Sequence, residues 1–105
     1  MKLTDLRDLL LTVTSDTFHY KAWAKPDKYI VWAEDGETDS LNADDQKTEQ
    51  VLQGTIDYFT KTEYDLNFEL IQAKLNSADL SWRLNSIQHE EETGYIHYEW
   101  VWEMV

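Results

Sequence analysis

Two histidines and a run of glutamates near the carboxyl end of the chain have the residue types of a metal site. The run is His89-Glu90-Glu91-Glu92, and His97 follows shortly after it. A metal centre needs three or four ligands that converge and are held in place by neighbouring groups. Three consecutive glutamates cannot all point inward, and a turn between two strands is a place where charged side chains are solvated. We therefore predict a solvated turn over residues 90–94 and no metal site.

Glu99 and Glu103 are the best candidates for general acid–base chemistry, because aromatic side chains flank them. Trp100 and Trp102 occupy the positions between them. Acid–base catalysis needs a carboxyl group in a poorly solvated cleft that shifts its pKa. The same alternation also fits a strand with aromatic residues on its inner face and glutamates on its outer face. We favour the strand, so neither glutamate is predicted to be catalytic.

The rest of the chain contains no recognisable catalytic motif. The three glycines stand alone at positions 36, 54 and 94, and neither a nucleophile elbow nor a phosphate-binding loop can be built around them. Cysteine is absent, which removes disulfides, thiolate metal sites and cysteine nucleophiles. We predict a protein that is not an enzyme, with no catalytic residue, no cofactor and no metal.

The length of the chain indicates one domain. Its 105 residues match the common size of a single domain, and two halves would each be too small to hold a core. The first residues are charged at short intervals, so we expect no targeting segment. No apolar run approaches the ~18 residues of a membrane span, and we expect no membrane partner. The protein is expected to fold in the cytosol.

Acidic residues dominate the charge of the chain and concentrate in one segment. There are 21 acidic and 9 basic residues, giving a net charge of −12, and residues 34–49 alone contribute −6 through seven acids and Lys47. This charge repels nucleic acid and anionic lipid. Without periodicity, residues 34–46 are predicted to form a flexible loop, longer than the usual ~4–6 residues. The seven acids are Glu34, Asp35, Glu37, Asp39, Asp44, Asp45 and Glu49.

Aromatic residues are abundant for so small a chain. Five Trp, six Tyr and three Phe exceed what one small core can bury, so some are expected at a contact surface. We place Trp100 and Trp102 at a subunit interface, together with Arg83. The Arg83 guanidinium could bind a carboxylate across that interface or within its own sheet, and the sequence leaves both open.

The first half of the chain predicts one helix and two strands. Leucines at helical spacing indicate a helix over Thr4–Val13, with Thr4 as its cap. Alternation over residues 18–23 and 28–33 predicts two strands. Lys25-Pro26-Asp27 has turn chemistry, so we expect these strands to form a hairpin.

The second half predicts three strands and one helix. Residues 48–61 are rich in β-forming residues, and a helix capped by Thr62 is expected to run to Leu75. Residues 80–88 and 95–104 alternate and flank the predicted turn. The element order is α-β-β-β-α-β-β. This order predicts an α+β fold in which two helices pack on one face of a largely antiparallel sheet.

Three stretches of the chain resemble small tail-completion proteins, or tail terminators, of bacteriophages and prophages of Gram-positive bacteria. The likeness is one of sequence character, length and element order, and together with the helices it covers most of the chain. The stretches are YIVWAEDG at residues 29–36, EQVLQGTIDYFTK at 49–61, and WRLNS at 82–86 leading to EEETGYIHYEW at 90–100.

The resemblance implies a structural role in the virion. Proteins of this family have an α+β fold and form a ring, commonly hexameric, at the head-proximal end of the tail. The ring stops growth of the tail tube and offers a surface to the head-completion or connector proteins. DNA passes through the ring without specific binding. The implied location is the host cytoplasm during assembly and then the head–tail junction, and the family has no catalytic residues to carry over.

The acidic loop would suit a channel for DNA. A ring of loops that each carry −6 would surround the channel with negative potential and would not hold phosphate. We therefore expect the double substitution Asp44→Lys and Asp45→Lys to impair DNA passage or assembly. The alternative is that these charges only keep the subunit soluble before assembly.

A different function also fits the composition. Densely acidic small phage proteins can mimic DNA and occupy the DNA-binding groove of a host enzyme. This role would need charges spaced like phosphates along an extended surface, whereas half of the net charge here lies in one segment. The DNA mimic is therefore our alternative to the assembly protein.

Overall fold

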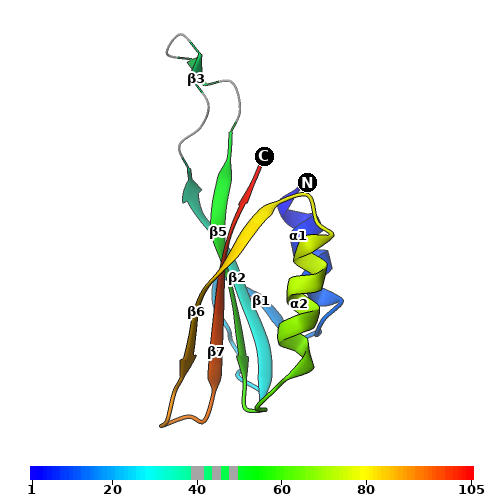
Figure 1. Cartoon of the computed structure of the whole chain (residues 1–105), viewed down its shortest axis with the longest axis vertical. Coiled ribbons are helices and arrows are strands. Elements are labelled where there is room, and N and C mark those ends of the chain that lie inside the picture. The colour runs from blue at the N-terminus through cyan, green and yellow to red at the C-terminus, as the bar shows by residue number, and fades with distance from the viewer. Residues whose placement is uncertain (39–41, 44–45, 48–49) are drawn as a thin grey trace.

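The computed structural model describes residues 1–38, 42–43, 46–47 and 50–105 of the chain. Two helices pack on one face of a five-stranded sheet, which confirms the predicted α+β class and layer arrangement (Figure 1). The elements in chain order are α1 (Leu3–Leu11), β1 (Thr17–His19), β2 (Lys28–Glu37), β3 (Asn42–Ala43), β4 (Gln46–Lys47), β5 (Leu52–Thr60), α2 (Leu66–Asn76), β6 (Ser81–His89) and β7 (Ile96–Met104).

The strands follow the order β1-β2-β5-β7-β6, and every neighbouring pair except β1–β2 is antiparallel. The main core lies between the helices and the central strands. Alternate residues of β5 and β7 point toward the helices, as the period of a strand requires, and meet the apolar stripes of α1 and α2. Its fully enclosed members include Leu6, Leu10, Ile30, Ile56, Tyr58, Ile71, Leu75 and Trp100.

The first two strands do not form the predicted hairpin. β1 lies parallel to β2, with Phe18 opposite Val31. The chain reverses first at Tyr20, where φ is +70° and the Lys21 N–H donates to the His19 carbonyl, a tight γ-turn. It reverses again before β2 begins, and two reversals restore the original direction. The predicted strand over residues 18–23 therefore ends at His19.

Both helices begin at residues other than the predicted caps. The N-cap of α1 is Lys2, whose backbone N–H donates to Asp5. The N-cap of α2 is Asp65 instead of Thr62, and its carboxylate accepts from the Asn67 N–H at 2.9 Å. Thr62 instead lies in the preceding turn. An N-cap is chosen by where its side chain can reach the first free N–H groups, which the residue type alone does not reveal.

Part of the predicted acidic loop is strand. Glu34–Glu37 belong to β2 and pair with β5, with an irregularity in register between Glu34 and Gly36. The short strands β3 and β4 pair with each other within the same stretch, and Figure 1 places β3 far beyond the ends of the helices. Strand pairing can continue into this polar segment because the ladder between antiparallel strands is made by main-chain hydrogen bonds. The predicted strand over residues 48–61 begins at Leu52.

Gly54 permits the closest approach in the sheet. It lies on β5 directly opposite Trp102 of β7, and an added Cβ would stand 2.5 Å from the Trp102 ring and 2.0 Å from the Ala33 carbonyl oxygen. The indole thus occupies the space of the missing side chain, and its Nε1–H donates to the Thr55 carbonyl at 3.2 Å. The glycine lets a large aromatic side chain lie flat across the neighbouring strand.

Candidate functional site

Three of the seven predicted channel acids lie at the far end of β2. Glu34, Asp35 and Glu37 belong to β2, whereas Asp39, Asp44, Asp45 and Glu49 lie outside the described residues. The Asp35 and Glu37 carboxylates are reached by glutamine side chains of the neighbouring chain segment at 3.5 and 3.4 Å. These acids are therefore positioned by a paired, two-stranded segment.

Glu34 is tied to β1 by its side chain. Its carboxylate accepts hydrogen bonds from the Tyr20 hydroxyl and from His19 Nε2, the latter at 3.0 Å. Partial burial opposes ionisation, but the hydrogen bonds from Tyr20 and His19 outweigh it and lower the pKa of Glu34. The His19 ring is sandwiched between Tyr20 and Trp32, with ring centroids 4.0 and 4.1 Å away. Glu34 thus secures the short strand β1 rather than standing free like a channel charge.

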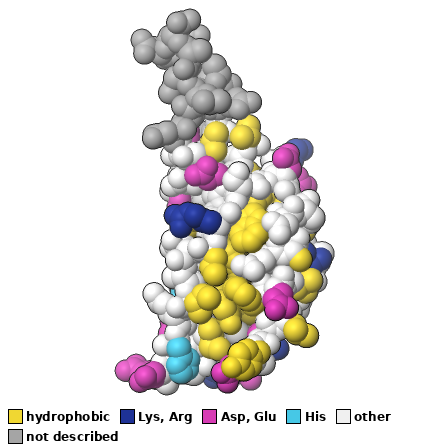
Figure 2. All heavy atoms as spheres, in the orientation of Figure 1, with side chains coloured by type: hydrophobic (Ala, Val, Ile, Leu, Met, Phe, Trp, Pro, Cys, Tyr) yellow, Lys and Arg dark blue, Asp and Glu magenta, His cyan; other side chains and the backbone are white. Residues whose placement is uncertain are grey.

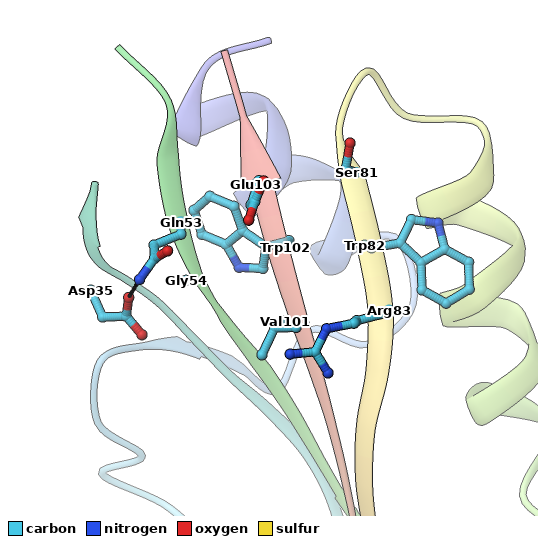
Figure 3. Close-up of a pocket in the computed structure, with 9 residues that line it drawn as sticks. All are labelled: Asp35, Gln53, Gly54, Ser81, Trp82, Arg83, Val101, Trp102 and Glu103. Carbon is cyan, nitrogen blue, oxygen red and sulfur yellow. Dashed lines mark hydrogen bonds between the residues drawn. The ribbon is translucent and has the colours of Figure 1, made fainter. Parts of the chain in front are cut away.

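Arg83 lies exposed on the edge strand β6, where the sequence placed a subunit contact. Figure 3 shows its side chain reaching across the sheet surface toward Val101 of β7. Within the described part of the chain its side-chain partner is the Asn85 oxygen at 3.0 Å, and no carboxylate lies within ion-pair distance. Arg83 lines a shallow pocket of about 370 Å³ that also includes Asp35 of β2, which is separated from β6 by β7 and β5. The Arg83 guanidinium is therefore not ion-paired within its own sheet among the residues described.

Trp100 and Trp102 are not surface residues, so their predicted place at an interface is wrong. Their exposed fractions are 0% and 1%. Both point toward the helices, and the Trp100 Nε1–H donates to Gln72 of α2 at 3.2 Å. The alternation of β7 correctly grouped the two indoles on one face, but the helices cover that face. They belong to the core.

The two histidines considered for a metal site lie on opposite faces of the sheet. In the β6–β7 register Gln88 pairs with His97, and His89 pairs with Ile96. Cross-strand partners share a face and successive residues alternate. His89 therefore faces the helix side and His97 the opposite side, and they cannot bind one ion together.

His97 instead meets two carboxylates that sequence reasoning did not connect with it. Its Nε2 lies 2.6 Å from Asp57 of β5, and Glu99 lies on the same face of β7. Ligand atoms of these three residues fall within 4.8 Å of one another. Asn85 Nδ2 donates to Glu99 at 2.7 Å, which fixes that carboxylate. The signal in the sequence was the alternation of β5, which places Asp57 on the polar face.

The chemistry of this cluster is that of a charged hydrogen-bonded pair. The hydrogen bond that His97 donates to Asp57 raises the pKa of His97 despite partial burial, which acts in the opposite direction. A cation would have to separate the 2.6 Å Asp57–His97 contact in order to bind both groups. The cluster also lies on a sheet face and not in a deep cleft. Its geometry fits the stabilisation of two adjacent strands better than catalysis.

No known protein-family model matches the sequence, and no curated protein matches it significantly. Among the helices that the structure describes, none is both long and apolar enough to cross a membrane. The functional argument therefore rests on the chain itself.

Proposed function

We propose that this chain is a structural assembly protein of a tailed bacteriophage or prophage, and that copies of it form a ring at the head–tail junction. Six subunits are expected. The ring terminates or completes the tail, contacts the tail tube and the head-completion or connector proteins, and lets DNA pass without binding it specifically. The subunit is made in the host cytoplasm and ends in the virion. The proposal builds on the resemblance of residues 29–36, 49–61 and 82–100 to the tail-completion family.

The observation that carries this proposal is the position of the acidic segment. Half of the net charge falls within residues 34–49. The described part of this segment consists of the end of β2 and the strands β3 and β4, and it extends away from the helices. Copies arranged in a ring would present these segments together. The resulting negative potential repels phosphate, so DNA could move past without being held.

The edges of the sheet offer backbone for contacts between subunits. β6 pairs on one side only, with β7, and its nine residues include one formal charge, Arg83, and no acid. Past Trp32, β2 has β5 as its neighbour and no longer pairs with β1. Open strand edges accept additional chains through main-chain hydrogen bonds. Of the three predicted interface residues, Arg83 retains this role in the proposal.

Removal of the protein from the producing genome tests the role directly. We expect tails of uncontrolled length, or finished tails and filled heads that fail to join, when particles are viewed by negative-stain electron microscopy. Expression of the wild-type chain from a plasmid should restore joined particles. Normal virions in the deletion strain would contradict the proposal.

A charge reversal tests the acidic segment separately. Asp35→Lys should lower the titre of infectious particles, because a cation at this end of β2 would attract phosphate. Asp16→Lys makes the same charge change at an exposed position before β1 and should leave the titre unchanged. Equal titres for all three proteins would refute a channel role. Capture of a host DNA-binding enzyme by the purified chain would favour the DNA mimic instead.

A further inference from the structure

An apolar groove runs between α2 and the β6–β7 hairpin. It has a volume of about 720 Å³, and its apolar lining comes from Tyr64, Phe68, Ile87, Ile96 and Tyr98. Figure 2 shows hydrophobic side chains gathered beside α2 on this face of the molecule. Ile87 is 54% exposed and Tyr64 87% exposed. Contiguous exposed apolar surface with a polar rim is a feature of contact sites.

The groove exists because α2 covers β7 but leaves β6 open. Phe68 stacks on Tyr98 of β7 with ring centroids 4.4 Å apart. The helix-facing residues of β7 from Tyr98 onward are buried, whereas Trp82 and Leu84 of β6 are only half-buried and Ile87 is exposed. One strand of the sheet therefore keeps an uncovered apolar side.

The surroundings of the groove are acidic. Glu63 and Glu69 line it and are exposed, and the exposed acids Glu91 and Glu92 lie in the β6–β7 turn that follows His89. The basic residue among its lining side chains is Lys61. A partner that combines an aromatic side chain with lysines would match both the apolar floor and this rim.

The same chain carries such an element in the loop between β1 and β2. Trp23 is 83% exposed and touches the protein through the edge of Phe18, at a centroid distance of 5.2 Å. Lys21 and Lys25 flank it and are exposed. Residues 20–28 contain three of the nine basic residues of the chain and one acid. This loop is therefore a basic, aromatic surface on a chain of net charge −12.

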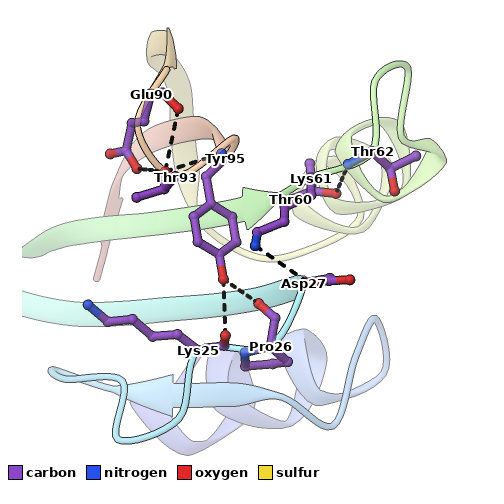
Figure 4. Close-up of polar contacts among 9 residues, drawn as sticks. All are labelled: Lys25, Pro26, Asp27, Thr60, Lys61, Thr62, Glu90, Thr93 and Tyr95. Carbon is purple, nitrogen blue, oxygen red and sulfur yellow. Dashed lines mark hydrogen bonds and ion pairs between the residues drawn. The ribbon is translucent and has the colours of Figure 1, made fainter.

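The loop is held in place rather than left free. The Tyr95 hydroxyl lies 3.0 Å from the Lys25 carbonyl and 2.7 Å from the Pro26 carbonyl, within hydrogen-bonding distance of both (Figure 4). The Lys61 N–H also donates to the Asp27 carbonyl at 3.0 Å. A fixed loop loses little conformational entropy when it binds, which favours its use as an anchor.

The loop and the groove lie on opposite faces of the sheet. Trp23 packs on Phe18, whose small cluster with Tyr29 and Tyr95 lies on the face away from the helices. The groove lies on the helix side, against Phe68 of α2. The sheet separates the two surfaces, so one copy cannot fill its own groove.

We propose that Trp23 of one subunit, with its flanking Lys21 and Lys25, docks into the acidic-rimmed groove beside Ile87 of the next subunit. This inference deepens the proposed ring and rests on it. Two different surfaces meet in such a contact, so it is head-to-tail, and its repetition closes a ring when the rotation between neighbours divides a full turn. Trp is among the residues enriched at the energetic centres of interfaces, and the opposite charges around it fix the partner's orientation.

Cysteine cross-linking tests the contact, because the natural chain has no cysteine. Ala24→Cys, next to Trp23, and His89→Cys, in the lining of the groove, keep Trp23 and Ile87 in place. The two variants are purified separately, mixed and treated with a short bismaleimide. We expect a covalent dimer from the mixture alone. A chain carrying both substitutions should give a ladder whose last band counts the subunits of the ring. Leu11→Cys, at an exposed position of α1, replaces His89→Cys as the control and should give no dimer with Ala24→Cys.

Charge and shape variants test the same contact without a cross-link. Ile87→Glu should weaken self-association by about 30-fold in sedimentation equilibrium, as expected for a central anchor, whereas Leu11→Glu should not. Lys21→Glu with Lys25→Glu should also weaken it, and the loss should shrink at high salt. Circular dichroism of each variant confirms that it is folded.

The outcomes separate the contact from the ring itself. Absence of the Ala24–His89 product at every protein concentration overturns the inference, as does cross-linking of His89→Cys to a different protein in assembled particles. If the cross-link is absent but particles lacking the protein fail to join heads to tails, the proposed function stands and the ring uses another contact. If those particles are normal, the proposed function fails whatever the cross-link shows.

Discussion

The two faces of the sheet use the same strands for different purposes. On the helix-covered face the central strands present large apolar residues such as Trp100 and Ile56, which are fully buried. On the opposite face the alternate residues include Asp57, His97 and Glu99, which are joined by hydrogen bonds or held by a neighbour. Successive residues of one strand thus lie in a dry core and on a polar surface.

The difference shows where contacts with other molecules can form. On the helix-covered face, the helices cover β5 and most of β7 but leave β6 partly uncovered, and the groove opens there. On the opposite face, residues 20–27 fold over Tyr29 and Tyr95. Both proposed contact surfaces therefore lie where the coverage of the sheet ends.

The largest contrast between the faces is expected from two neighbouring residues of β7. Trp100→Ala should lower the free energy of unfolding by ~3–5 kcal/mol, because it empties a fully buried site. Val101→Ala, at a half-buried position of the other face, should cost about 1 kcal/mol. Urea denaturation measures both, and equal losses would show that the helices do not define the core.

The two unstrained glycines of the β2–β5 pair provide the next contrast. Gly54→Ala should destabilise the protein by about 1–3 kcal/mol, since the new methyl group meets the Ala33 carbonyl and the Trp102 ring. Gly36→Ala adds a methyl group with nothing within 4 Å and should change stability by less than ~0.5 kcal/mol. The melting temperature of Gly54→Ala should therefore lie clearly below that of Gly36→Ala. Equal melting temperatures would contradict the close packing at Gly54.

A buried polar contact on the covered face should have a smaller effect. The Tyr58 hydroxyl donates to Asp65 at 2.7 Å and accepts from Asn67. Tyr58→Phe should lower the free energy of unfolding by about 1–2 kcal/mol, because it leaves a buried carboxylate with fewer donors. Tyr98→Phe is the control, since the Tyr98 hydroxyl has no hydrogen-bond partner among the residues described. Urea denaturation should give a lower free energy of unfolding for Tyr58→Phe than for Tyr98→Phe.

The smallest effect is a pH dependence on the polar face. Asp57 raises the pKa of His97 above its ordinary value of 6.5, so the folded protein holds this proton more tightly than the unfolded chain. The stabilisation is full below pH 6.5 and is lost as the pH rises through the folded pKa. The stability advantage of the wild type over Asp57→Asn should shrink across this window. His97→Gln should lack the dependence, and NMR titration of His97 gives the folded pKa.

Several elements of the fold were predictable because their cause is local. Alternation over β7 correctly placed Tyr98, Trp100 and Trp102 on one face, and helical spacing located both helices. The side chain of a residue is directed by backbone geometry, which the sequence pattern records. The error about the two tryptophans concerned what covers that face, which no pattern within the strand can state.

The polar site required the pairing of distant strands. Asp57 and His97 are forty residues apart, and they meet because β5 and β7 are neighbours in a particular register. A register shifted by one residue would move every side chain of a strand to the other face. The separation of His89 from His97 has the same origin.

The sequence by itself determined the α+β class, the order of the elements and the concentration of acid between Glu34 and Glu49. These follow from composition and from the periods of helix and strand. Only the tertiary structure decided that β1 runs parallel to β2, that Trp100 is enclosed, and that a groove and a lysine-flanked Trp23 lie on opposite faces. Each of these depends on which surfaces are brought together at long range, and packing between distant segments is a property of the whole chain.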